Sequence, residues 1–288
     1  MADPFDNPFP APRSRLANAI GAARAQGRAA LVGYLPAGFP TLPSSLAALR
    51  ALAKHGGDIV EVGLPDRAPT RDGPVIRAAL DAGTRPAHLI DTIAELSRTG
   101  AAVVGVAYWT AITCYGTDRF ARDLESAGAA GVLCPDLPRR ATRAWSATST
   151  EHGLDAVLLA PHGVTRDELT EIDTLGGGFV YATAGRGPTG AATLVHSLAH
   201  HHVERVRAAV RLPVCAGIGI SGPAHAARAA RYADAVAVGT AFVRLLAEAP
   251  DERAATGAVR GLARELRQAM TAPPATGTVH RTRPVPPP

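Results

Sequence analysis

Hydrophobic positions recur along the chain as short, nearly continuous runs that are separated by longer, alanine-rich segments with helical spacing. Runs of this kind are typical of parallel strands that are buried on both faces. The expected strands are Ala29–Pro36, Asp58–Pro65, Ala102–Tyr108, Gly131–Pro138, Asp155–Pro161, Gly178–Thr183, Pro213–Gly219 and Ala233–Thr240. The helical patterns between them are Leu42–His55, Arg85–Arg98, Thr117–Ala127, Arg139–His152, Arg166–Leu175, Ser197–Val210 and Gly222–Tyr232.

Eight such units in 288 residues favour a closed (β/α)8 barrel, the TIM-barrel architecture of the α/β class, over an open doubly wound sheet. An amphipathic pattern at Ser14–Arg28 predicts an extra N-terminal helix, and a last helix is expected at Thr256–Met270. The barrel should therefore span residues 14–270. Residues 1–13 are expected to be a flexible N-terminus and residues 271–288 a disordered, proline-rich tail.

Composition narrows the function classes. The net charge of +5 comes from scattered basic residues, and aromatic residues are sparse, which disfavours nucleic-acid binding and suits a small anionic substrate. The chain contains no run of about 18 apolar residues and its first residues lack a signal-peptide core, so neither a membrane span nor secretion is expected. Three dispersed cysteines argue against a disulfide framework and against zinc. A cytoplasmic protein is the simplest interpretation.

Two carboxylates stand where such a barrel carries its chemistry, which is at the C-terminal ends of the strands and on the loops that follow. Glu61 lies among the apolar residues of the second strand, and Asp72 lies in the loop after it. If Glu61 faces inward, its pKa should be raised while Asp72 stays ionised, and the pair could share acid and base work. Alternatively, Glu61 pairs with an arginine and Asp72 caps the following helix.

Glycines at the ends of the last two strands suggest a phosphate site. Ala216–Ser221 reads AGIGIS and Val238–Ala241 reads VGTA, so backbone N–H groups and a helix beginning near Thr240 could approach an anion. The loops after strands 7 and 8 are a recurrent phosphate site of this fold. The stretch Gly178–Gly190 adds a glycine-rich loop that could close over a ligand. Ordinary turn glycines and a solvent loop are the alternatives.

The chemistry must run without an imine. Lys54 is the only lysine and lies at a helix C-terminus, so an imine-forming aldolase has no lysine at the site. His200–His202 reads HHH inside a helical pattern without metal-ligand spacing and is interpreted as a solvated face. We therefore expect neither a metal nor a cofactor, and any carbon–carbon cleavage would rely on acid–base groups.

With these motifs in place, the chain resembles the alpha subunit of tryptophan synthase from about Ser14 to Glu248. The matching stretches include LVGYLPAGFP, DIVEVGLP, YGTDRFA, PDLP, AGIGIS and VGTAFV. The resemblance implies a carbon–carbon lyase of tryptophan biosynthesis. Its reaction is the retro-aldol cleavage of indole-3-glycerol phosphate to indole and glyceraldehyde 3-phosphate.

The resemblance also implies roles for individual residues. Glu61 matches the family's general acid/base, Asp72 the aspartate that handles the indole N–H proton, and Tyr181 the tyrosine beside the catalytic glutamate. Phe179 stands where many members have tyrosine, and Thr189 matches the threonine of the closing loop. The full set of implied substrate and phosphate contacts is Tyr108, Phe179, Thr189, Gly190, Gly219, Gly239 and Thr240.

Departures from the family pattern lie where that pattern implies contact with a beta subunit. Ala68 replaces an aspartate, Tyr108-Trp109-Thr110 lacks the usual asparagine, and the loop Ala184–Pro188 is unusual. These changes favour a stand-alone lyase that releases free indole for a specialised pathway. An ordinary alpha subunit that requires a beta subunit, a catalytically weak regulatory paralogue and a different phosphorylated substrate remain alternatives.

Overall fold

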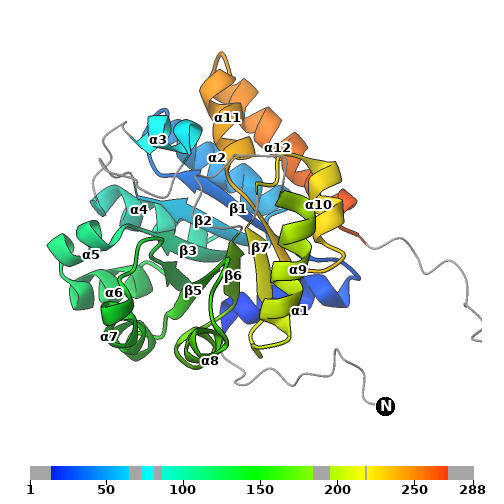
Figure 1. The fold of residues 1–288 in the computed structure, drawn as a ribbon. Coiled ribbons are helices and arrows are strands. Elements are labelled where there is room, and N and C mark those ends of the chain that lie inside the picture. Colours follow the sequence, from blue (N-terminus) through cyan, green and yellow to red (C-terminus); the bar gives the residue numbers. More distant parts are fainter. Residues whose placement is uncertain (1–13, 65–72, 81–85, 184–194, 218, 272–288) are drawn as a thin grey trace, which may run out of the picture.

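The computed structural model describes residues 14–64, 73–80, 86–183, 195–217 and 219–271. Its strands form one closed parallel barrel in the order β1-β2-β3-β4-β5-β6-β7-β8, with helices around it (Figure 1). The strands are β1 (Ala30–Pro36), β2 (Ile59–Gly63), β3 (Ala102–Val106), β4 (Gly131–Leu133), β5 (Asp155–Pro161), β6 (Val180–Thr183), β7 (Val214–Gly217) and β8 (Ala235–Val238). The predicted (β/α)8 barrel is therefore confirmed.

The helices alternate with the strands as expected, with additions. They are α1 (Arg15–Ala25), α2 (Leu42–His55), α3 (Pro74–Leu80), α4 (Pro86–Ser97), α5 (Trp109–Tyr115), α6 (Thr117–Ser126), α7 (Arg139–Glu151), α8 (Arg166–Leu175), α9 (Val195–Arg207), α10 (Pro223–Ala229), α11 (Thr240–Glu248) and α12 (Glu252–Ala269). The short helices α3 and α5 were not predicted, whereas α11 begins at Thr240, as expected.

Some predicted boundaries were wrong. β4 ends at Leu133, whereas the predicted strand continued to Pro138, because Asp136 instead accepts a hydrogen bond from the backbone N–H of Trp109. α12 begins four residues before the predicted Thr256, because Asp251 caps it by accepting a hydrogen bond from the N–H of Ala254. The predicted flexible N-terminus and the proline-rich tail beyond Thr271 lie outside the described residues.

Two hydrophobic layers stabilise the barrel. One fills the barrel interior and includes Val32, Ile59, Val104 and Phe179, while the other lies between the strands and the surrounding helices. Because successive residues of a strand face opposite sides, each strand contributes to both layers. Leu16 and Ile20 of α1 belong to the interior layer, so the extra N-terminal helix closes the amino end of the barrel.

The first and last parts of the described chain meet at this amino end. Arg28, just before β1, forms an antiparallel bridge with Thr271, just after α12, and α12 packs against α2 (Figure 1). The side chains of Arg28 and Arg267 meet on Asp58, which precedes β2. The opposite, carboxyl end of the barrel carries the predicted site residues.

Candidate active site

Glu61 points into the barrel. On β2, Ile59 belongs to the interior layer, whereas Val60 and Val62 belong to the layer under the helices. The alternation therefore turns Glu61 inward, where its backbone pairs in register with Tyr34 on β1 and Val104 on β3. Only 3% of the residue is exposed. The sequence alone left this orientation open.

Burial alters the acidity of Glu61. Its Oε1 atom is buried and has no hydrogen-bond partner within the part of the chain that the structure describes. Loss of solvation disfavours the carboxylate and raises the pKa of Glu61 to about 8. The alternative in which Glu61 pairs with an arginine is not found among the described residues. At neutral pH Glu61 therefore carries a proton, which suits a general acid.

Tyr34 is a site residue that the sequence analysis missed. It alternates with Ala30 and Val32 on the inner face of β1, and its ring lies over Gly63 of β2. A Cβ atom built on Gly63 would lie 2.2 Å from the Tyr34 hydroxyl oxygen, and one built on Gly239 would lie 3.4 Å from Cδ1 of its ring. Tyr34 thus lies between the Glu61 strand and the end of β8. The sequence signal that could have identified Tyr34 is its position in ALVGYLP, where it is an alternate residue with Ala30 and Val32.

Tyr181 occupies the corresponding place on β6. A Cβ atom on Gly217 would approach Cε1 of the Tyr181 ring to 1.9 Å, so only glycine leaves room for the ring in this position. Phe179 is fully buried, with its ring centroid 6.0 Å from that of Tyr181. Phe179 therefore supports Tyr181 from inside the barrel.

Cys215 lies on the inner wall close to Glu61. It pairs in register with Tyr181, and burial, followed by the nearby Glu61 carboxyl, raises the pKa of its thiol. Cys215 is accordingly a neutral, inert wall of the interior, as its apolar strand predicted.

The predicted phosphate residues follow the ends of β7 and β8, two strands that pair with each other. Gly219 has a positive φ of 52°, and Gly239 is the N-cap of α11, where no side chain forms a cap hydrogen bond. Thr240 is the first residue of that helix. The first backbone N–H groups of a helix lack partners within it and favour a bound anion.

The other predicted site residues are placed only in part. Tyr108 is 4% exposed and forms the N-cap of α5 after β3, on the carboxyl-end side of the barrel. Asp72, Thr189 and Gly190 lie outside the described residues, as does Ala68.

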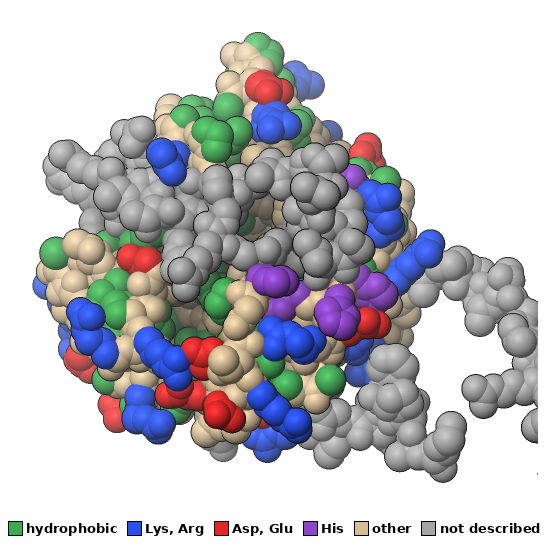
Figure 2. Space-filling view, viewed as in Figure 1, with side chains coloured by type: hydrophobic (Ala, Val, Ile, Leu, Met, Phe, Trp, Pro, Cys, Tyr) green, Lys and Arg blue, Asp and Glu red, His purple; other side chains and the backbone are tan. Residues whose placement is uncertain are grey.

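The histidine stretch differs from its prediction. His200 and His201 are exposed, and histidine side chains gather over α9 in Figure 2. His202, by contrast, is buried and donates from Nε2 to the backbone oxygen of Ala160 at 2.9 Å. Only part of HHH is therefore a solvated face. Across the described ranges, no three histidine, cysteine or acidic side chains are grouped so that they could hold a metal ion.

Over α7 and α8, side chains of both charges intermix on the surface (Figure 2). Arg139 pairs with Glu168 and Arg143 with Glu171. Among the helices that could be searched, none combines the length and hydrophobicity required to cross a membrane.

Comparison with known proteins places this geometry in context. The family model described as "Tryptophan synthase alpha chain" matches residues 20–271. The tryptophan synthase alpha chain of Streptomyces avermitilis is 44% identical over 256 residues, which cover 87% of this chain and 92% of the relative. That of Thermobifida fusca is 42% identical, covering 86% and 94%.

Solved structures agree with this similarity. A chain of Mycobacterium tuberculosis tryptophan synthase matches with a TM-score of 0.83 and 39% identity, covering 90% of this chain and 99% of that one. The tryptophan synthase alpha subunit of Legionella pneumophila matches with a TM-score of 0.82 and 26% identity, covering 89% and 98%. The match therefore extends over the whole barrel.

Proposed function

Because the chain belongs to the tryptophan synthase alpha chain family, we propose that it cleaves indole-3-glycerol phosphate to indole and glyceraldehyde 3-phosphate. The observation that carries this proposal is Glu61, a buried, protonated carboxyl on the inner wall of the barrel. The family resemblance assigns the acid/base role to this same position. Independent physical reasoning and family membership thus converge on one side chain.

In the proposed reaction, Glu61 donates its proton to the ring carbon of indole that bears the glycerol side chain. The bond between that carbon and the side chain then breaks, and its electrons restore the aromatic ring. The adjacent hydroxyl loses its proton and becomes the aldehyde of the product. The resulting Glu61 carboxylate is the base available to take up this proton, so the group returns to its starting state.

Asp72 and the tyrosines have supporting roles in this proposal. Asp72 interacts with the indole N–H as positive charge develops on the ring. Tyr34 and Tyr181 form aromatic walls on β1 and β6, and a flat indole ring fits between such walls. The helix start at Gly239–Thr240, together with Gly219, holds the phosphate. The two ends of the substrate are thereby fixed relative to Glu61.

We further propose that the chain performs this cleavage without a beta subunit. Support comes from the segment after β3, where the family pattern implies a subunit contact. The backbone N–H of Trp109 donates to Asp136 at 2.7 Å, and its ring packs edge-on against the buried Trp145 at 5.9 Å. Here Trp109 is held by contacts inside its own chain.

The alternative is an alpha subunit that works within a complex, and the similarity to a Mycobacterium tuberculosis tryptophan synthase chain favours it. Steady-state indole release by the purified protein, alone and with added tryptophan synthase beta chain, separates the two. A stand-alone lyase should turn over at nearly the same rate in both assays. Activation within the usual range of coupling between sites, about 5–150-fold, would establish the complex instead.

A further inference from the structure

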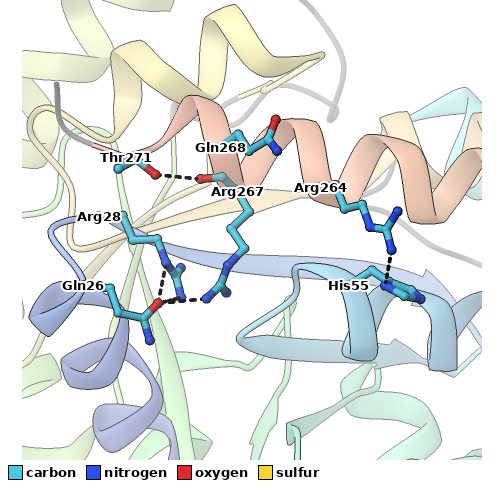
Figure 3. Close-up of a pocket in the computed structure, with 7 residues that line it drawn as sticks. All are labelled: Gln26, Arg28, His55, Arg264, Arg267, Gln268 and Thr271. Carbon is cyan, nitrogen blue, oxygen red and sulfur yellow. Dashed lines mark hydrogen bonds between the residues drawn. The ribbon is translucent and has the colours of Figure 1, made fainter.

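A cavity of about 330 Å³ opens at the amino end of the barrel, on the face opposite the site described above (Figure 3). Its walls come from the connection between α1 and β1, the end of α2 and the last turns of α12. Three arginines, Arg28, Arg264 and Arg267, line it together with His55. A cavity of this size falls within the range of small-molecule sites, about 300–1,000 Å³.

Among the residues that the structure describes, these three guanidinium groups share one carboxylate. Arg28 binds Asp58 in a bidentate manner at 2.6 and 2.7 Å, and Arg267 reaches the same carboxylate at 3.1 Å. Within the described part of the chain, the one hydrogen bond of Arg264 is to Nδ1 of His55 at 3.1 Å (Figure 3). Because a guanidinium has five donors, Arg264 keeps most of them unused.

The basic residues also compensate for the negative ends of helix dipoles, so their charge must be compared with the partial charges of the helix ends. The C-terminal ends of α1, α2 and α12 reach this face, each equivalent to about half a negative charge. Lys54 and Arg260 add two cations beside His55. Among the described residues, the three lining arginines and the two cations beside His55 outweigh the carboxylate of Asp58 and about 1.5 negative charges from the helices, so a positive excess remains. His55 reports this field, since burial and then Arg264, Arg260 and Lys54 lower its pKa.

We propose that this cavity is a second ligand site, which binds a phosphorylated, hydroxyl-rich small molecule of the sugar-phosphate class. Arg264 forms the principal contact to the phosphate, because its donors are not committed to a carboxylate. The remaining lining residues are Gln26, Gln268 and Thr271, whose amide and hydroxyl groups suit a polyol. Among the described residues, the lining contains no Phe, Tyr or Trp side chain, which disfavours an indole or a nucleobase.

Such a ligand would join three segments that are far apart in the sequence. Gln26 and Arg28 lie before β1, His55 lies at the end of α2, and the arginines of α12 close the other side. Binding to the folded chain alone raises its stability by mass action. The site is separate from the lyase site, so the proposal goes beyond the reaction and does not depend on it.

Calorimetric titration and thermal melts with ribose 5-phosphate test this proposal. We expect binding and a raised melting temperature for the native chain and for Arg253→Gln, a control at the exposed start of the same helix. Arg264→Gln should weaken binding by about 10–100-fold, the usual effect of losing a charged hydrogen bond. A ligand-free melting temperature and a far-UV circular dichroism spectrum equal to those of the native chain show that the variant is folded.

Three results would overturn the proposal. Equal binding by the native chain and Arg264→Gln would place the ligand elsewhere, including at Gly239 and Thr240. Absence of binding would remove the site. Ribose 5-phosphate binding no tighter than inorganic phosphate would overturn the hydroxyl-rich ligand class. None of these binding results bears on the lyase proposal, which is tested separately by the rate of indole release.

Discussion

Two acidic residues, three positions apart, show how the two ends of the barrel differ. Asp58 precedes β2 at the amino end and accepts hydrogen bonds from Arg28, Arg267 and the backbone N–H of Leu31. Glu61, inside the same strand, has no partner for Oε1 among the described residues. One carboxylate is fully satisfied, and the other is left buried and protonated.

The difference between Asp58 and Glu61 shows that stabilising contacts and catalytic groups lie at different ends of this barrel. In barrels of this type the amino-end face is concerned with stability and the carboxyl-end face with catalysis. The paired Asp58 joins the two ends of the chain. The isolated Glu61 lowers the stability of the fold as pH rises above about 4.5, and the same isolation gives it a proton to donate. Four predictions test this contrast.

The largest expected effect is on catalysis. Glu61→Gln should lower kcat/KM for indole release by about 10²–10⁴-fold, because a positioned acid–base group commonly contributes that much. The measurement is indole formation from indole-3-glycerol phosphate. Glu125→Gln, on the exposed surface of α6, is the matched control and should behave as the native chain. A near-normal rate for Glu61→Gln would remove the assignment.

The largest loss in the free energy of unfolding is expected when the ion-pair cluster of Arg28, Asp58 and Arg267 at the amino end is broken. Asp58→Asn leaves the buried Arg28 without its charge partner, and removing one member of a buried ion pair costs about 3–5 kcal/mol. Urea unfolding measures this loss. As a control, Asp118→Asn removes an exposed partner of His152, an interaction worth about 0–1 kcal/mol. Equal effects of the two substitutions would show that the buried ion pairs contribute no more to the free energy of unfolding than an exposed pair.

The same Glu61→Gln variant should gain stability at high pH. Below pH 4.5 the glutamate is neutral in both the folded and the unfolded chain, so the substitution changes little. As pH rises from 4.5 to about 8, Glu61 ionises only in the unfolded chain, and the native protein loses stability that the glutamine variant keeps.

The resulting advantage of the variant is on the order of 5 kcal/mol above pH 8. Urea unfolding at about pH 5 and about pH 9 measures it. If the difference were independent of pH, the carboxyl would not be isolated in the folded chain.

A smaller effect is expected at Gly217. In Gly217→Ala the new Cβ would lie 1.9 Å from Cε1 of Tyr181, so the ring must move away from its position on the wall. We expect about a tenfold loss in kcat/KM, since small misplacements of a site group have effects of this order or larger. Gly257→Ala, with open space around it in α12, is the matched control and should retain activity. Unchanged activity in both would show that Tyr181 needs no fixed position.

The sequence predicted the barrel because its strands are apolar on both faces and its helices are amphipathic, and both patterns are local. It also indicated Glu61 as a candidate site residue, since a carboxylate in an apolar strand is conspicuous, but it left the direction of the side chain open. It could not predict that His202 is buried, because that depends on the contact between α9 and the backbone of Ala160. Likewise, the sequence could not predict the amino-end cavity. Its arginines are held by contacts such as the hydrogen bond from Arg267 to Asp58, two residues that are 209 positions apart.

The protonation state of Glu61 is the central claim, and carbon-13 NMR titration of its side-chain carboxyl tests it most directly. The signal is assigned by its absence in Glu61→Gln. The account predicts a titration midpoint near 8, with the carboxyl still protonated at neutral pH. A midpoint near the ordinary value of 4.5 would contradict it, because Glu61 would then be a solvated or paired carboxylate and not a proton donor.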